Sequence, residues 1–184
     1  MKKVLLVLAG VVLLSIQGSA AVILVSDVGT FSSATDMRSY TFTLAAPSDV
    51  IMRTWGWAGG TNLNGVVIPA GGFDPILSLY RLDTNAQIAQ NDDGGCANVG
   101  SSAGLCWDAF IHTYLAAGNY GVVLSVFNNF PTGNFFPTGA GTPSFSGRTT
   151  NYAVDLSGVP EPVTMALFGS GLLALGFVRR FRRS

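Results

Sequence analysis

The segment between residues 21 and 158 lacks most of the side chains on which catalytic and metal sites are built. His112 is the only histidine of the chain, which excludes a site made of two or three histidines. Its position in the alternating stretch AFIHTYL indicates an ordinary strand residue. Glutamate is absent before Glu161, which disfavours glutamate-dependent hydrolysis but not a pair of aspartates. GSSAG, at residues 100–104, resembles a nucleophile elbow only superficially. We therefore expect that the protein is not an enzyme.

Lysine is also missing from residues 21–158, where four arginines against nine aspartates give a formal charge of −5. Such an acidic segment is a poor partner for nucleic acid, and it lacks the basic patch that binds an anionic membrane surface. Six of the ten basic residues lie instead at the chain ends: Lys2, Lys3, Arg179, Arg180, Arg182 and Arg183.

The first twenty residues have the order of a secretory signal peptide. Two lysines precede an apolar run from Val4 to Leu14, and the small residues Gly18, Ser19 and Ala20 follow. This order predicts export through the Sec translocon and a mature domain over residues 21–158. A retained N-terminal anchor is the alternative, which the short apolar run disfavours.

A second apolar run, residues 163–178, contains no charge and is followed by the arginine cluster. At about 1.5 Å per residue, a helix over this run would be roughly 24 Å long, somewhat less than the ~30 Å hydrocarbon core. We predict a short transmembrane helix with the arginines on the cytoplasmic side and residues 21–158 outside. A surface or core helix is disfavoured because its only polar residues would be Thr164 and Ser170.

Residues 159–184 resemble the PEP-CTERM sorting signal of exopolysaccharide-producing Gram-negative bacteria: a Pro-Glu-Pro box, a short helix and an arginine-rich tail. The resemblance implies that an exosortase, a membrane-embedded sorting enzyme, recognises the box and delivers the protein to the cell surface or the extracellular matrix. Two prolines would also hold the box in an extended conformation. The implied sorting residues are Val159, Pro160, Glu161, Pro162, Arg179, Arg180, Arg182 and Arg183.

Between the two ends, apolar residues alternate with polar ones in short runs such as RSYTFTLAA, PILSLYRL, NYGVVLSVF and TTNYAVDL. Glycine, asparagine, serine and threonine fill the gaps between these runs. A period of two with dense turn residues predicts strands, and no helical stripe of more than two or three turns is present. We predict an all-β sandwich of about seven to nine strands.

The segment from Phe73 to Phe127 resembles the bacterial pre-peptidase C-terminal type of domain. FDPILSLY matches the pattern F-D-x-x-L-x-L-Y, an Asn-Asp-Asp turn follows, and LAAGNYGV matches L-x-x-G-x-Y-x-V. The resemblance implies a jelly-roll-like β-sandwich that serves as a non-catalytic accessory module binding carbohydrate or protein. Glycine-rich residues 59–72 and the loop FNNFPTGNFFPTGAGTPSF lengthen this chain relative to the pattern, so binding loops are not carried over.

Oxygen ligands gather within thirty-five residues at expected strand ends and in a turn. Six to eight such oxygens bind Ca²⁺ in proteins, although a tight turn explains the Asn-Asp-Asp-Gly-Gly stretch without any metal. Both interpretations stay open. The candidate calcium ligands are Asp74, Asp83, Asn91, Asp92, Asp93 and Asp108.

Cys96 and Cys106 are the only cysteines, and an exported protein meets an oxidising environment. We predict a disulfide that stabilises the fold by roughly 2–3 kcal/mol through a closed loop of about eleven residues. A redox-active pair is the alternative, but the C-x-x-C spacing is missing.

The tryptophans are candidate residues for sugar binding. Trp55 and Trp57 are expected to share one strand face, and Trp107 is expected at a strand edge. These rings either stack on sugars or belong to the core.

Three functions remain open: a sorted, non-catalytic surface or matrix protein that binds exopolysaccharide, a permanently membrane-anchored periplasmic binding module, and an aspartate-dependent hydrolase.

Overall fold

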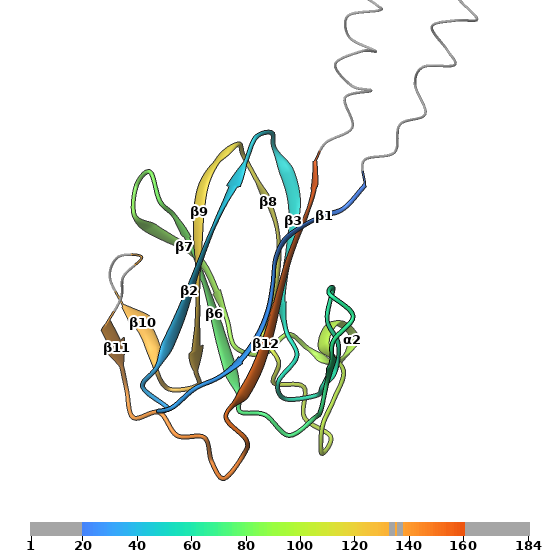
Figure 1. The fold of residues 1–184 in the computed structure, drawn as a ribbon. Helices are drawn as coiled ribbons and strands as arrows, with labels where there is room; N and C mark the ends of the chain where they lie inside the picture. The colour runs from blue at the N-terminus through green and yellow to red at the C-terminus, as the bar shows by residue number, and fades with distance from the viewer. Residues whose placement is uncertain (1–19, 133–134, 136–137, 161–184) are drawn as a thin grey trace, which may run out of the picture. The chain divides into compact units, whose positions relative to one another are not determined.

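Two four-stranded sheets pack face to face across one apolar core (Figure 1). The computed structural model describes residues 20–132, 135 and 138–160, and Ala21–Val159 forms one compact unit. The first sheet has the order β1 (Val22–Thr30), β12 (Asn151–Pro160), β3 (Ser48–Thr54), β8 (Phe110–Leu115). The second has the order β2 (Met37–Leu44), β9 (Gly118–Val126), β6 (Pro75–Arg81), β7 (Ala86–Asn91).

These eight strands have the connectivity of a jelly roll. Counted along the chain, the first sheet contains the first, eighth, third and sixth strands, and the second contains the second, seventh, fourth and fifth. Among these eight strands, every connection crosses from one sheet to the other except the β6–β7 hairpin. This is the connectivity of a jelly roll, which contains two Greek keys. The predicted jelly-roll-like β-sandwich is confirmed.

The alternating patterns explain which side chains fill the core. On β3, Val50 and Met52 point inward, and on β9, Val122 and Leu124 do so. The predicted period of two is thus confirmed on both sheets. Strand β6 is buried on both faces, because Phe135 lies against Tyr80 and Val123 on the outer side of the second sheet.

Short elements decorate the sandwich. Two small hairpins pair β4 (Gly60–Thr61) with β5 (Val67–Ile68), and β10 (Phe130–Thr132) with β11 (Thr138–Ala140). A one-turn helix, α2 (Cys96–Val99), precedes β8. Within the described ranges, no helix is long and apolar enough to span a membrane.

The first and the last residues of the compact unit lie at the same end of the first sheet. Strands β1 (blue) and β12 (orange) run side by side in Figure 1, and Val22 pairs with Gly158. The predicted signal peptide and the predicted helix over 163–178 lie outside the described residues.

Candidate functional site

An open pocket of about 530 Å³ lies among the loops where β12 begins. Arg148 lines it three residues before β12, whereas Gly158, which pairs with Val22, lies near the other end of this strand. At about 3.3 Å per residue, the ten-residue strand places its two ends roughly 30 Å apart, so the pocket lies far from Gly158. Aromatic, acidic and basic side chains line the pocket, among them Trp57, Asp74, Asp93, Trp107, Phe145 and Arg148.

Trp57 forms the rigid centre of one wall. Its indole Nε1 donates to the carbonyls of Leu105 (3.0 Å) and Ser102 (3.3 Å), and only 3% of the residue is exposed. The ring centroid of Trp107 lies 4.4 Å from that of Trp57. The guanidinium carbon of Arg148 lies 3.3 Å from the Trp57 ring centroid, a cation–π contact. Trp107, which is only partly buried, therefore offers more surface to a ligand than Trp57 does.

Asp108 holds the chain that carries Trp57. This carboxylate is fully buried and accepts hydrogen bonds from Trp57 N (3.1 Å), Ala58 N (2.7 Å) and Thr54 Oγ1 (2.9 Å). Burial raises the pKa of Asp108, and the three hydrogen bonds oppose that rise. Asp108 thus holds in place the backbone that carries Trp57, although it does not itself line the pocket.

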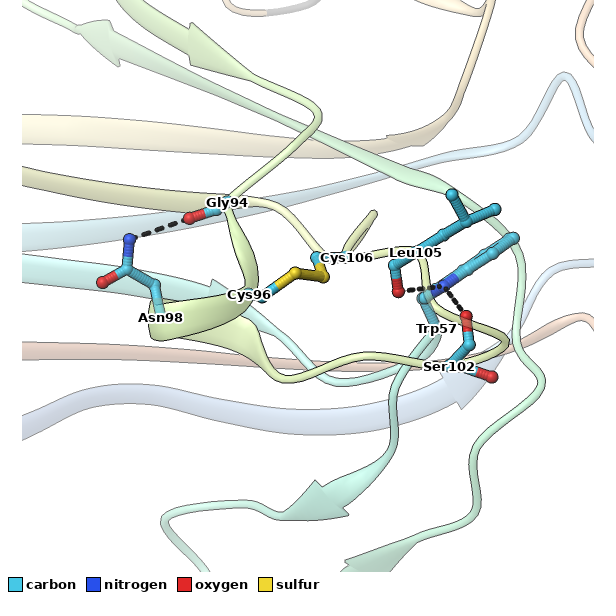
Figure 2. The surroundings of a disulfide bond; sticks show 7 residues. All are labelled: Trp57, Gly94, Cys96, Asn98, Ser102, Leu105 and Cys106. Atoms are coloured by element: carbon cyan, nitrogen blue, oxygen red, sulfur yellow. Dashed lines mark hydrogen bonds between the residues drawn. A yellow bond between two sulfur atoms is a disulfide. The ribbon is translucent and has the colours of Figure 1, made fainter.

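A disulfide between Cys96 and Cys106 closes the neighbouring loop, which confirms the predicted bridge (Figure 2). The closed loop contains Ser102 and Leu105, whose carbonyls accept the Trp57 indole N–H. The covalent link therefore restrains the same wall that Asp108 supports.

Asp74 brings an incompletely satisfied carboxyl group to the pocket. Its Oδ1 is buried and has no hydrogen-bond partner among the described residues. Burial, followed by the charges of Asp93, Asp92 and Asp108, raises the pKa of Asp74 to about 8, and Arg148 opposes the rise. Burial and Asp92 also raise the pKa of Asp93.

This shift predicts a pH dependence of stability. The folded protein binds the Asp74 proton more tightly than the unfolded chain, so stability decreases as pH rises from about 4 towards 8. Asp74→Asn removes this penalty and is expected to raise the thermal midpoint at pH 9 while changing it little at pH 4. Scanning calorimetry of both proteins at both pH values measures the effect. An equal change at the two pH values would contradict the assignment.

The structure brings together only some of the candidate calcium ligands. Asp74 and Asp93 line the pocket, but Asp83 lies beyond the opposite end of β6, paired with Arg81 at 3.2 Å. Asn91 forms local contacts, accepting from Phe110 N at 2.9 Å and donating to the carbonyl of Asp93 at 3.2 Å.

Across the described ranges, no three His, Cys, Asp or Glu side chains converge as metal ligands. Grouping Asp83 with Asp74 in one site is therefore wrong, because a whole strand separates them. Calcium binding by the remaining residues stays a prediction.

Trp55 is not part of the pocket lining, and the expectation that it shares a strand face with Trp57 is wrong. Strand β3 ends at Thr54, so both tryptophans lie in the connection that follows. Trp55 Nε1 donates to Asp155 Oδ2 at 2.6 Å, and Arg53 stacks on the Trp55 ring at 3.6 Å. Trp57 and Trp107 do line the pocket.

The remaining candidates lie elsewhere. His112 contacts Asp49 Oδ1 at 3.1 Å on the exposed face of β8, as expected of an ordinary strand residue. Ser102 lies in a tight turn bridged to Leu105, and its Oγ is 3.5 Å from Arg148 Nη2. The G-x-S-x-G letters around Ser102 therefore do not form a strand-to-helix elbow.

Val159 and Pro160 end β12. The other predicted sorting residues lie outside the described part of the chain: Glu161, Pro162, Arg179, Arg180, Arg182 and Arg183.

Sequence reasoning missed Arg148 and Phe145. The only available signal was that Arg148 is one of four basic residues in the acidic segment and stands alone in a polar loop.

Comparison with known proteins identifies the C-terminal segment. Residues 158–183 match the PEP-CTERM protein-sorting motif. This motif is the signal for exosortase-dependent sorting, so the chain is an exported, membrane-anchored precursor whose processing partner is an exosortase. No curated protein matches the chain.

Among solved structures, the pre-peptidase C-terminal domain of collagenase from Bacillus anthracis is similar at a TM-score of 0.43 and 10% identity, covering 73% of this chain and 89% of that one.

Proposed function

We propose that the protein is a sorted, non-catalytic extracellular protein that binds exopolysaccharide through the pocket formed by Trp57, Trp107 and Asp74. It would act at the cell surface or in the extracellular matrix of a Gram-negative bacterium. The observation that carries this proposal is the combination of aromatic rings with carboxyl and guanidinium groups in one open pocket.

The chemistry of the lining suits a sugar. The apolar face of a pyranose ring packs on aromatic rings, and its hydroxyl groups exchange hydrogen bonds with carboxylates and guanidinium groups. Trp107 and Phe127 supply rings for the first role, and Phe127 is 43% exposed. Asp74 and Asp93 supply oxygen atoms for the second.

The position of the pocket supports the same proposal. The sorting motif begins at residue 158, at the far end of β12 from Arg148. A domain held by that motif would present the pocket loops at the end of the sandwich away from its attachment point. After delivery of the protein to the cell surface, a polymer outside the cell could then reach the pocket.

The test is sedimentation of the mature protein with exopolysaccharide purified from its own host. Trp107→Ala is expected to weaken binding at least tenfold, about 1.4 kcal/mol, because it removes a stacking surface. Tyr114→Ala, which removes an exposed aromatic ring on β8, is the matched control and should bind like wild type.

Thermal midpoints establish that the variants fold, and Phe127→Ala provides a second pocket variant. Unchanged binding by both pocket variants would contradict the proposal.

A second candidate, an aspartate-dependent glycoside hydrolase, is favoured by one observation. Asp74 and Asp93 line the same pocket, and a pKa of about 8 would keep Asp74 protonated at neutral pH, as a general acid requires. New reducing ends in the same incubations, lost in Asp74→Asn, would favour the hydrolase. Intact polymer would favour the binding module.

A further inference from the structure

The pocket contains two carboxyl groups, Asp74 and Asp93, that form no ion pair with any cation in the described part of the protein. Asp74 Oδ1 is buried without a hydrogen-bond partner, and no cation lies within ion-pair distance of Asp74 or Asp93 there. The ion pairs found in the described ranges, Arg81–Asp83 and His112–Asp49, involve neither residue. Burial favours the protonated form of Asp74. A cation placed beside Asp74 and Asp93 would favour the charged form of both groups, and the ion pairs thus formed would supply binding energy.

Arg148 is the basic side chain of the pocket, but its guanidinium is already engaged. Its Nε donates to the carbonyl of Gly72 at 2.6 Å, and its Nη2 lies 3.5 Å from both the Trp57 carbonyl and Ser102 Oγ. Its flat face covers Trp57. These contacts hold the guanidinium on the Trp57 wall, leaving Asp74 and Asp93 without a direct counter-charge.

Aromatic rings line the same pocket as these two carboxyl groups. Trp107, Phe127 and Phe145 line the same pocket, and the ring centroid of Phe145 lies 5.7 Å from that of Phe73, the residue before Asp74. A cation beside aromatic faces gains cation–π energy in addition to its attraction to carboxylates. A primary ammonium group offers three donors and is small enough to lie between such groups.

We infer that the pocket selects glycans that carry free amino groups, with the ligand ammonium placed against Asp74 and Asp93 and the sugar ring against Trp107. This inference rests on the proposed glycan binding and adds the substrate class. N-acetylation removes the positive charge from the amine, and a uronic acid introduces a second negative charge, which cannot form an ion pair with either carboxyl group. The same two carboxyl groups therefore favour glycans with free amines over N-acetylated glycans and over glycans that contain uronic acids.

Isothermal titration of the mature protein with β-1,4-linked glucosamine oligomers tests the inference, with N-acetylglucosamine oligomers and neutral glucose oligomers of equal length for comparison. The glucosamine oligomer is expected to bind at least tenfold more tightly than either. Asp93→Asn and Asp74→Asn are each expected to reduce this preference to within about threefold, and added salt is expected to weaken it. Asp83→Asn, at the other end of β6, is the matched control and should retain the full preference.

The outcomes separate the inference from the proposed function. Equal affinity for the three oligomers would overturn amine selectivity and leave glycan binding in place. Failure to bind these oligomers and the host polysaccharide would overturn both. Polylysine binding as tight as glucosamine-oligomer binding would reduce the effect to general charge attraction and also overturn the inference.

Discussion

Asp108→Ala is expected to lower the free energy of unfolding by roughly 3–5 kcal/mol, the largest effect of any substitution considered. The reason is that Asp108 is fully buried and accepts hydrogen bonds from Trp57 N, Ala58 N and Thr54 Oγ1. Alanine leaves these donors without an acceptor, in addition to a small cavity. Because two of the donors belong to the chain around Trp57, the pocket wall should loosen as well.

Urea unfolding followed by tryptophan fluorescence measures this loss. Asp108→Asn keeps the size of the side chain and should retain part of the stability. Asp83→Asn is the surface control, since its partly exposed ion pair with Arg81 is worth at most about 1 kcal/mol. A loss below about 1 kcal/mol in Asp108→Ala would show that the buried carboxylate does not hold this wall.

Replacing both cysteines by serine is expected to cost about 3 kcal/mol, by the loop-closure estimate for the segment between Cys96 and Cys106. For a domain of this size, such a loss lowers the thermal midpoint by roughly 10 °C. The closed loop provides the Ser102 and Leu105 carbonyls that bind the Trp57 indole, so glycan affinity should fall as well.

The experiment compares wild type and the double serine variant by calorimetry, each with and without a reducing agent. Reduction should destabilise the wild type to the level of the variant and leave the variant unchanged. Intact mass after alkylation reports the thiols directly. Equal midpoints for the oxidised wild type and the variant would contradict a stabilising role for the bridge.

The strands could be predicted from the sequence because the alternation of apolar and polar residues lies within each strand and does not depend on the neighbouring strands. The run Tyr120, Val122, Leu124 and Val126 predicts one buried face of β9, and these residues do lie in the core. The local sequence did not predict that both faces of β6 are buried. Its second face is buried because Phe135, more than fifty residues later, covers Tyr80.

Gly121 permits this cover, since an added Cβ there would collide with the Phe135 ring. No local pattern records such a contact between distant segments.

The candidate site was only partly predictable for the same reason. Asp74 and Asp83 are close in sequence, but the extended strand between them places them at opposite ends of the sheet. Trp57 and Arg148 are ninety-one positions apart, yet they stack in the pocket. The presence of only two cysteines in an exported chain predicted the disulfide. No such signal predicted a pocket assembled from loops at one end of a jelly roll.

The central claim is that this jelly-roll domain is delivered outside the cell by removal of both chain ends. The most direct test is the intact mass of the mature protein from its native host, with and without the exosortase. We predict a species that lacks Met1–Ala20 and the residues after the Pro160–Pro162 box when the enzyme is present, and a species that retains Val163–Ser184 when it is deleted. Retention of Val163–Ser184 in both strains would contradict the claim and identify a permanently anchored module.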